Sequence, residues 1–430
     1  MNSASISKPL GRASRGVLTA IVFAGCGLLA ACGGGSSTGF AGVGGGSGSP
    51  GGGTGSSGGS GLNTVAVTVD AGPAGVGAVN TLYTTVTVCA PGSATKCQTI
   101  DHVQVDTGST GLRILASALG AGVQAADLPQ ANDAYGNPLD ECVQFADGYS
   151  WGAVRTADVT IGSEQAMAVP VQVVADPAAG ATPASCVQGP QENTVQSFGA
   201  NAILGVGNFL SDCGIDCATG AIPGTYYDCP AGGACVPVAV PVAAQLQNPV
   251  ALFPSDNNGV ILDLPAVASP AATVDGSMIF GIDTQSDNAF PAGAGLYTLD
   301  RYYGTLTTFY TGIGYPSSFI DSGSNGYFFT DDTLTTCADQ PAFYCPPSTQ
   351  SLQASIEGLN GVTANVAFSV DNADADFATN GAAVPDLAGP AGTNLQGSFD
   401  WGLPFFYGRP VYVAFEANSA AGVVGPWVGF

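Results

Sequence analysis

Two short stretches of the sequence decide the fold: Val103-Gln104-Val105-Asp106-Thr107-Gly108-Ser109 and Ser318-Phe319-Ile320-Asp321-Ser322-Gly323-Ser324. In each, an apolar strand delivers an aspartate to a tight turn, and the glycine lets neighbouring backbone approach the carboxylate. The hydroxyl groups and backbone amides of the turn can hydrogen-bond that carboxylate and fix its orientation. One copy alone is an ordinary turn sequence. Its repetition, once in each half of the chain, predicts two related lobes.

The repeated aspartates suggest a specific chemistry. Two such turns that face one another across a pseudo-twofold axis would bring the carboxyls of Asp106 and Asp321 together. Like charges that close cannot both ionise readily, so the pair shares one proton. The ionised carboxylate can take a proton from a water that attacks a peptide carbonyl, while the protonated partner polarises the carbonyl oxygen. Asp106 and Asp321 are therefore the predicted catalytic residues. The predicted supporting residues are Thr107, Gly108, Ser109, Ser322, Gly323 and Ser324.

This arrangement resembles the catalytic loops of the pepsin-like aspartic proteases, and the resemblance runs from about Tyr83 to the C-terminus. The matching segments are the hairpin 83–112, the flap-like hairpin 145–162, the loop-closing segment 202–207, the start of the second sheet at 276–283, and the closing strands 411–416 and 428–430. The resemblance implies a mostly β, bilobal fold with short helices. It also implies endopeptidase activity on extended polypeptide, without a metal or cofactor.

Three departures from the family pattern bear on activity. The predicted flap residues are Phe145, Asp147, Gly148 and Tyr149. The family normally has a flap tyrosine, whose hydroxyl helps to orient the water, where this chain has Phe145. Tyr149 and Trp151, on the same hairpin, are candidate substitutes.

The other two departures are Arg113, where an aromatic residue is usual, and the run Asp400-Trp401-Gly402-Leu403-Pro404 in place of an apolar-apolar-Gly segment. Residues 399–409 look like the signature of a bacterial lipoprotein family of unassigned function. Such membership would place the chain in a divergent, bacterial branch of the pepsin-like fold. The alternative to a peptidase is a non-catalytic binding protein of this fold, or a protein of unassigned function, at the cell envelope.

Short alternating strands separated by Gly, Pro, Asn and Asp dominate the chain after residue 62 and indicate a mostly β class. The predicted strands are 65–69, 83–88, 103–105, 157–161, 169–174, 260–264, 277–280 and 411–415. Helical periodicity is brief, near 114–119, 240–246 and 331–336. The predicted lobes are 63–255 and 256–430, because Pro and Ala interrupt the strand pattern between about 254 and 276.

The N-terminus has the features of a lipoprotein signal. Basic residues precede an apolar run that is too short to span a bilayer comfortably, and the run ends in Leu29-Ala30-Ala31-Cys32. This sequence resembles a lipobox, which implies a signal peptide at 1–31 and lipidation of Cys32. The Gly/Ser-rich segment 32–62 is then a tether. No aspartate follows Cys32, so the resemblance implies an outer-membrane lipoprotein, facing the periplasm or the cell surface.

Charge and cysteine content agree with export. Beyond the signal, five basic residues stand against 32 acidic ones, a formal charge of about −27 that disfavours nucleic acid. The expected partners are the membrane lipid and an extended polypeptide, and the expected state is monomeric. Ten cysteines remain beyond Cys32, an even number that suits an oxidising compartment. Their proximity predicts the disulfides Cys89–Cys97, Cys142–Cys186 and Cys337–Cys345, with Cys213, Cys217, Cys229 and Cys235 paired among themselves. With one histidine, His102, no metal site is expected.

Overall fold

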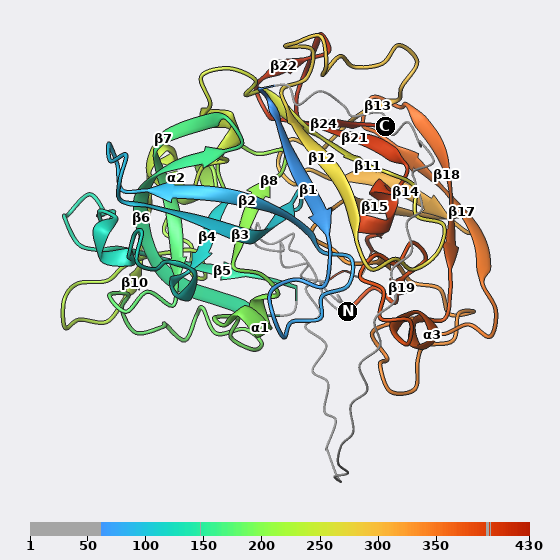
Figure 1. The fold of residues 1–430 in the computed structure, drawn as a ribbon, viewed down its shortest axis with the longest axis horizontal. Coiled ribbons are helices and arrows are strands. Elements are labelled where there is room, and N and C mark those ends of the chain that lie inside the picture. Colours follow the sequence, from blue (N-terminus) through green and yellow to red (C-terminus); the bar gives the residue numbers. More distant parts are fainter. Residues whose placement is uncertain (1–61, 147, 393–394, 396) are drawn as a thin grey trace, which may run out of the picture.

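The computed structural model describes residues 62–146, 148–392, 395 and 397–430. The predicted signal peptide, Cys32 and nearly all of the predicted tether lie outside these residues, as does Asp147 of the predicted flap. Strands greatly outnumber helices in the described chain, and the helices are short (Figure 1). The predicted mostly β class with short helices is therefore confirmed.

The largest sheet has fifteen strands and takes strands from both halves of the chain. From the first half it contains β1 (Thr64–Val69), β2 (Leu82–Cys89), β3 (Cys97–Asp106), β4 (Thr110–Leu115), β5 (Leu139–Gln144), β6 (Tyr149–Ile161), β7 (Glu164–Val174), β8 (Ala202–Val206), β9 (Tyr226–Asp228) and β10 (Val236–Pro237). From the second half it contains β11 (Gly259–Leu264), β12 (Val274–Phe280), β13 (Leu296–Thr298), β21 (Arg409–Ala414) and β24 (Trp427–Gly429). The strand order is β10-β9-β5-β6-β7-β4-β8-β3-β2-β1-β12-β11-β21-β24-β13.

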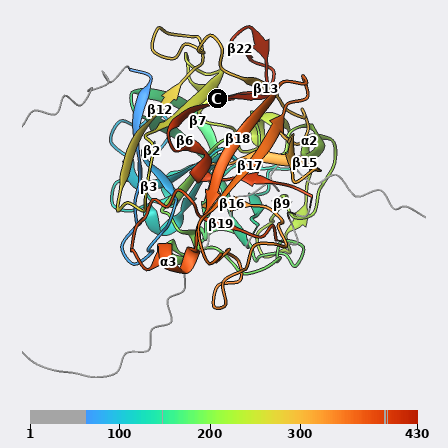
Figure 2. The same ribbon diagram turned by 90° about the vertical axis from the view of Figure 1, so that its right-hand side faces the viewer.

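The second sheet has seven strands, all from the second half of the chain. In spatial order they are β18 (Thr363–Val370), β17 (Gln350–Glu357), β14 (Leu306–Tyr310), β15 (Ile313–Ile320), β20 (Asp400–Trp401), β16 (Tyr327–Phe328) and β19 (Ala388–Gly389). A small hairpin is formed by β22 (Ser419–Ala420) and β23 (Val423–Val424). Figure 2 shows β17 and β18 on the side of the molecule that the second half occupies.

The first strand joins the two halves. β1 pairs antiparallel with β12 along its whole length, from Thr64 opposite Ile279 to Val69 opposite Val274. Its other edge pairs with β2 of the first half. In Figure 1 it lies between the blue and green strands and the yellow ones.

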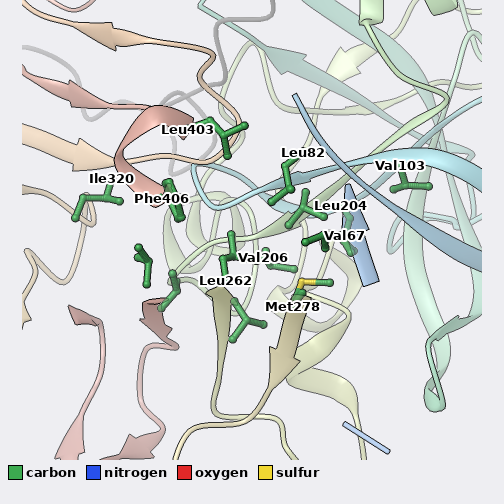
Figure 3. Packing of buried hydrophobic residues seen from close by; sticks show 14 of the residues in the cluster. Val67, Leu82, Val103, Leu204, Val206, Leu262, Met278, Ile320, Leu403 and Phe406 are labelled. Carbon is green, nitrogen blue, oxygen red and sulfur yellow. The ribbon is translucent and has the colours of Figure 1, made fainter. Parts of the chain in front are cut away.

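The core continues across this join. Val67, from β1, is fully buried in the same apolar cluster as Leu204, Leu262, Met278 and Ile320. Figure 3 shows these side chains as parts of one cluster to which both halves contribute. Burial of apolar side chains on one face of each strand accounts for the alternation in the sequence.

The predicted strands are confirmed apart from Phe415, which follows the end of β21, whereas the helical segments are shorter than predicted. The α-helices are α1 (Val195–Phe198), α2 (Ile215–Thr219) and α3 (Ala373–Phe377). The 3-10 helices include η1 (Ala116–Ala118), η2 (Ala125–Asp127), η3 (Val242–Ala244), η4 (Val250–Leu252) and η6 (Leu403–Phe406). Ile114 and Leu115 belong to β4, because their apolar side chains are buried in the sheet. The predicted helix at 331–336 is a turn, closed by the Leu334 N–H on the Asp331 carbonyl at 3.2 Å. No helix among the described residues has the length and apolar character needed to span a bilayer.

The described cysteines form five disulfides. Cys89–Cys97, Cys142–Cys186 and Cys337–Cys345 are the bridges expected from sequence proximity. The remaining four cysteines pair as Cys213–Cys217 and Cys229–Cys235, which settles the alternatives that the sequence left open.

Candidate active site

Both copies of the aspartate motif lie at equivalent places in the fold. Asp106 is the last residue of β3, and Asp321 follows the last residue of β15. Each strand has a parallel neighbour, β8 beside β3 and β20 beside β15. Gly205 and Gly402 stand opposite the two motifs, and a Cβ there would lie 2.5 Å from the Thr110 nitrogen or 2.2 Å from the Gly326 oxygen. Only glycine permits this close approach of backbone.

Each aspartate is held by its own turn through the same pair of hydrogen bonds. Asp106 Oδ1 accepts the Gly108 N–H at 2.8 Å, and its Oδ2 accepts the Ser109 hydroxyl. Asp321 Oδ1 accepts the Gly323 N–H at 2.7 Å, and its Oδ2 accepts the Ser324 hydroxyl at 2.9 Å. The repeated pattern orients the two carboxyls as related copies, and it places four of the predicted supporting residues around them.

The remaining two supporting residues bind the loops to one another. The Thr107 N–H donates to Ser322 Oγ at 3.1 Å, and the Ser322 N–H donates to Thr107 Oγ1 at 2.9 Å. Each hydroxyl then donates onward, Thr107 to the Ile320 carbonyl at 3.3 Å and Ser322 to the Val105 carbonyl at 2.8 Å. These four bonds are buried and fix the distance between the two loops.

The two carboxyls lie in contact range of one another's loops. A Cβ on Gly108 would stand 2.6 Å from Asp321 Cγ and 2.7 Å from both of its oxygens. Burial raises the pKa of Asp321 well above its usual range, and the neighbouring Asp106 and Asp400 carboxylates raise it further. Asp321 therefore favours its protonated form beside the like carboxyl of Asp106.

The pair is enclosed. Asp106 and Asp321 are both 0% exposed. A small cavity of about 40 Å³ borders the loops at Thr107–Thr110 and at Phe319 and Ile320. Its wall is completed by Gly207, Asn208, Phe209, Leu299, Tyr303, Gly304, Leu306 and Val428. This volume holds a few water molecules.

The predicted flap is the turn between β5 and β6, which the Phe145 N–H closes on the Gly148 carbonyl at 2.7 Å. The Phe145 ring is buried and packs edge-on against Phe198, with 6.0 Å between ring centroids. Ala146 packs against an apolar cluster of the second half that contains Phe319. This end of the hairpin therefore packs against the second half of the chain.

The two aromatic residues that were candidates to replace a flap tyrosine lie elsewhere. Tyr149 and Trp151 are buried in a cluster that contains the sulfurs of Cys142, Cys186 and Cys229. The Trp151 indole nitrogen donates to the Gly180 carbonyl at 2.8 Å. That hypothesis was wrong, because the pleat directs these rings to the disulfide-rich side of the hairpin.

Arg113 is part of a buried network that the sequence analysis did not find. Its guanidinium donates to Glu141 Oε1 at 2.7 Å and to the Thr110 carbonyl at 2.8 Å, and lies 3.5 Å from Asp212 Oδ2. The Tyr226 hydroxyl donates to Asp212 at 2.7 Å. The network joins the exit of the Asp106 loop to the flap strand β5. The one feature of the sequence that could have predicted this network is a single arginine within an apolar strand.

Asp400 was also missed as a site residue. It is 0% exposed, and burial raises the pKa of its carboxyl well above the usual range. The feature of the sequence that could have identified it is its position: an aspartate directly precedes Trp401 and Gly402, where the family pattern has an apolar residue.

Two groups of residues among those described have the proximity that a metal site needs: Asp140, Cys229 and Cys235, and Cys337, Cys345 and Asp374. The cysteines in both groups are joined in disulfides. Their sulfurs therefore lack the thiolate charge that binds zinc.

The family that matches this chain has no assigned function. None of the curated proteins matches the sequence significantly. Among solved structures, the chain is similar to an aspartic proteinase from Irpex lacteus, with 15% sequence identity and a TM-score of 0.49. That alignment covers 85% of this chain and 96% of the other. A family model described as a protein of unknown function, DUF3443, matches residues 59–430. The chain therefore belongs to the DUF3443 family.

Proposed function

We propose that this protein is an aspartic endopeptidase that uses Asp106 and Asp321. One observation carries the proposal: two aspartate turns from different halves of the chain are joined by reciprocal Thr107 and Ser322 bonds, so that their carboxyls form one buried pair. A structural role for the turns alone does not require two like charges to be held together, because such an arrangement costs free energy on ionisation.

The proposed reaction uses the unequal protonation of the pair. The Asp106 carboxylate removes a proton from water as the water oxygen forms a bond to the peptide carbonyl carbon. Asp321 gives its proton to the carbonyl oxygen, which yields a neutral tetrahedral diol. A proton then passes from Asp106 to the amide nitrogen, the carbon–nitrogen bond breaks, and Asp321 recovers its proton from the diol. The products are a carboxylic acid and an amine, and the pair returns to its starting state.

Substrate entry requires the flap turn to move, because both aspartates are fully buried. The contact of Ala146 with the cluster around Phe319 is the one that an extended peptide displaces. In this proposal Phe145 and Ala146 belong to the part that moves, in place of the tyrosine-bearing flap of the pepsin-like enzymes.

The test is cleavage of an unfolded protein substrate by the purified full chain from about pH 3 to about pH 8, the range over which a shared-proton pair titrates. Asp106→Asn and Asp321→Asn variants are compared with an Asp332→Asn control, an exposed aspartate outside the site. Pepstatin-sensitive cleavage that both site variants lack and the control retains supports the proposal. Equal cleavage by all four proteins overturns it.

A second candidate function is peptide binding without turnover at the cell envelope. It is favoured by the complete burial of both carboxyls and by Phe145, which lacks the hydroxyl that helps to orient a water. On this hypothesis an immobilised peptide library is bound equally by the wild type and by Asp106→Asn, and no peptide is cleaved at any pH.

We propose in addition that the protein is anchored by lipid on Cys32 as a monomer at the outer membrane. The lipobox-like sequence and the five disulfides, which form in an oxidising compartment, support this location. Membrane fractionation of the wild type and Cys32→Ala tests the anchor. Loss of the variant from the membrane fraction supports it, and unchanged fractionation contradicts it.

A further inference from the structure

A third buried carboxyl stands beside the proposed catalytic pair. Asp400 lies in β20, where its backbone pairs with Phe319 on one side and Phe328 on the other. The next residue, Trp401, directs its ring into the aromatic core, where its nitrogen donates to Thr308 at 3.0 Å. Because successive side chains of a strand alternate, Asp400 points to the opposite face, toward the Asp321 loop.

The first half of the chain has an apolar residue at this place. In β8, Leu204 and Gly205 stand opposite Val105 and Asp106. In β20, Trp401 stands opposite Ile320, and Gly402 follows. The residue of β8 that corresponds to Asp400 is therefore Ile203. The carboxyl is thus an asymmetric addition to an otherwise repeated arrangement.

Asp400 has no partner that neutralises it. Both of its oxygens are buried, and neither makes a hydrogen bond of normal geometry to a described residue. Within the described chain, no ion pair involves Asp106, Asp321 or Asp400. Three carboxyls without a cation cannot all ionise in a buried site.

The Ser324 hydroxyl connects Asp400 with the pair, since it donates to Asp321 at 2.9 Å and lies beside Asp400. Burial raises the pKa of Asp400 well above its usual range, the Ser324 hydroxyl lowers it, and the Asp106 charge raises it. The Asp400 charge in turn raises the pKa of Asp321.

Other groups around β20 do not compete with this coupling. Tyr327, on β16, is the titratable side chain opposite Trp401, and burial keeps its hydroxyl neutral by raising its pKa. The positive charge of Arg409 acts on Tyr327. The paired residues of β15, Phe319 and Ile320, and the residues of η6 carry no titratable side chain.

We propose that Asp400, a buried carboxyl without a hydrogen-bond partner beside the Asp321 loop, is a positioning residue of the site that keeps the proton on Asp321. The proposal deepens the peptidase function and rests on it. As the pH rises, ionisation of Asp400 opposes ionisation of Asp321. Asp321 thereby retains the proton that it gives to the peptide carbonyl, and the alkaline limit of activity moves up toward neutral pH.

The activity test compares pH profiles of kcat/KM for the wild type, Asp400→Asn and Asp400→Ile, the last of which installs the residue that β8 has. The control is Asp376→Asn, because burial and the charges of Asp371 and Asp386, not the pair, raise the pKa of Asp376 to about 6. Both Asp400 variants are expected to lose activity at lower pH than the wild type, with about a tenfold loss at pH 7 and less than about a twofold change at pH 5. The proposal is overturned if kcat/KM of both variants falls at the same alkaline pH as that of the wild type.

A second measurement does not depend on peptidase activity. The pH dependence of unfolding free energy from about pH 4 to about pH 8 reports protons that the folded state holds and the unfolded chain has released. We expect Asp321→Asn to flatten this dependence more in the wild-type background than in Asp400→Asn, because the two groups are coupled. Equal effects in both backgrounds overturn the inference. If no variant and no wild type cleaves peptide, the proposed function fails, while this comparison still decides whether Asp400 governs the proton of Asp321.

Discussion

Thr107 and Ser322 each donate a backbone N–H to the other's hydroxyl, at 3.1 and 2.9 Å, across the junction between the two halves of the molecule. The bonds are buried, and the residues directly precede the two turn glycines. The relationship makes the position of one aspartate depend on the other. It also shows that the halves are joined at the site itself, as well as through β1.

Removal of one hydroxyl from this exchange should destabilise the protein and reduce activity together. Thr107→Val leaves the Ser322 N–H buried without its acceptor, which costs about 1–3 kcal/mol of unfolding free energy. Chemical denaturation measures the loss. Thr87→Val, at an exposed hydroxyl pair in the sheet, is the control and should change stability by less than about 0.5 kcal/mol. Equal effects of the two substitutions contradict the prediction.

Substitution of the turn glycine should separate the two carboxyls. A Cβ at Gly108 stands 2.6 Å from Asp321 Cγ, so Gly108→Ala forces the Asp321 carboxyl or the loop to shift. Cleavage should fall by at least about 100-fold, because displacement of a reacting group by about 1 Å costs that much. Gly392→Ala is the matched control, since open space surrounds that position and its backbone is not left-handed. An active Gly108→Ala enzyme would show that the pair tolerates separation.

The buried arginine should be essential to the fold. In Arg113→Met, the Glu141 and Asp212 carboxyls lose their cation, and the uncompensated charge costs about 3–5 kcal/mol. The loss should be smaller at low pH, because burial raises the pKa of Asp212 and a protonated Asp212 needs no cation. The exposed Arg301→Met provides the control for removal of a guanidinium. Thermal unfolding at acid and neutral pH measures both effects, and a loss independent of pH would point to packing instead of charge.

Asp140 should make the protein less stable as the pH rises. Burial raises the pKa of Asp140 to about 6, against an ordinary value of 3.8, although the Gly180 N–H donates to it at 2.7 Å. Between these two values the folded state holds a proton that the unfolded chain has released, so the unfolding free energy falls with rising pH and the loss is complete above about pH 6. Asp140→Asn should flatten this fall, whereas the exposed Asp332→Asn should not. A wild-type stability that is constant from about pH 4 to about pH 7 would refute this.

Two disulfides of the first half close loops of very different length and should contribute differently to the free energy of unfolding. Cys142–Cys186 closes a separation of 44 residues and Cys213–Cys217 one of 4. Loop-closure entropy then predicts losses of roughly 4 and roughly 2 kcal/mol when both cysteines of a bridge become alanine. Denaturation of the two double variants tests the order. A larger loss from the short bridge contradicts an entropic origin.

Local patterns made much of this structure predictable. Alternation along β1 and β12 identified strands because each buries alternate side chains. The paired motifs identified the Asp106 and Asp321 turns because every supporting bond within a turn spans two or three residues. The predicted helical segments were too long, because short apolar runs such as Ile114-Leu115 suit a buried strand as well as a helix turn.

The parts that escaped prediction depend on residues distant in sequence. Arg113 meets Glu141 and Asp212 only after the sheet has formed. Asp400 likewise reaches Asp321 through the parallel pairing of β20 with β15. Spacing along the sequence does not predict such long-range contacts, whereas it does constrain the residues of a turn.

The position of β1 has a mechanical consequence. The strand starts at Thr64, directly after the segment proposed as the tether, and its six residues pair with β12 of the other half. If the proposed anchor holds the chain at the membrane, a pull through this segment would load the pairing of β1 with β12 before it loads either half alone. Such tension would act on a junction separate from the Thr107–Ser322 exchange that aligns the two aspartates.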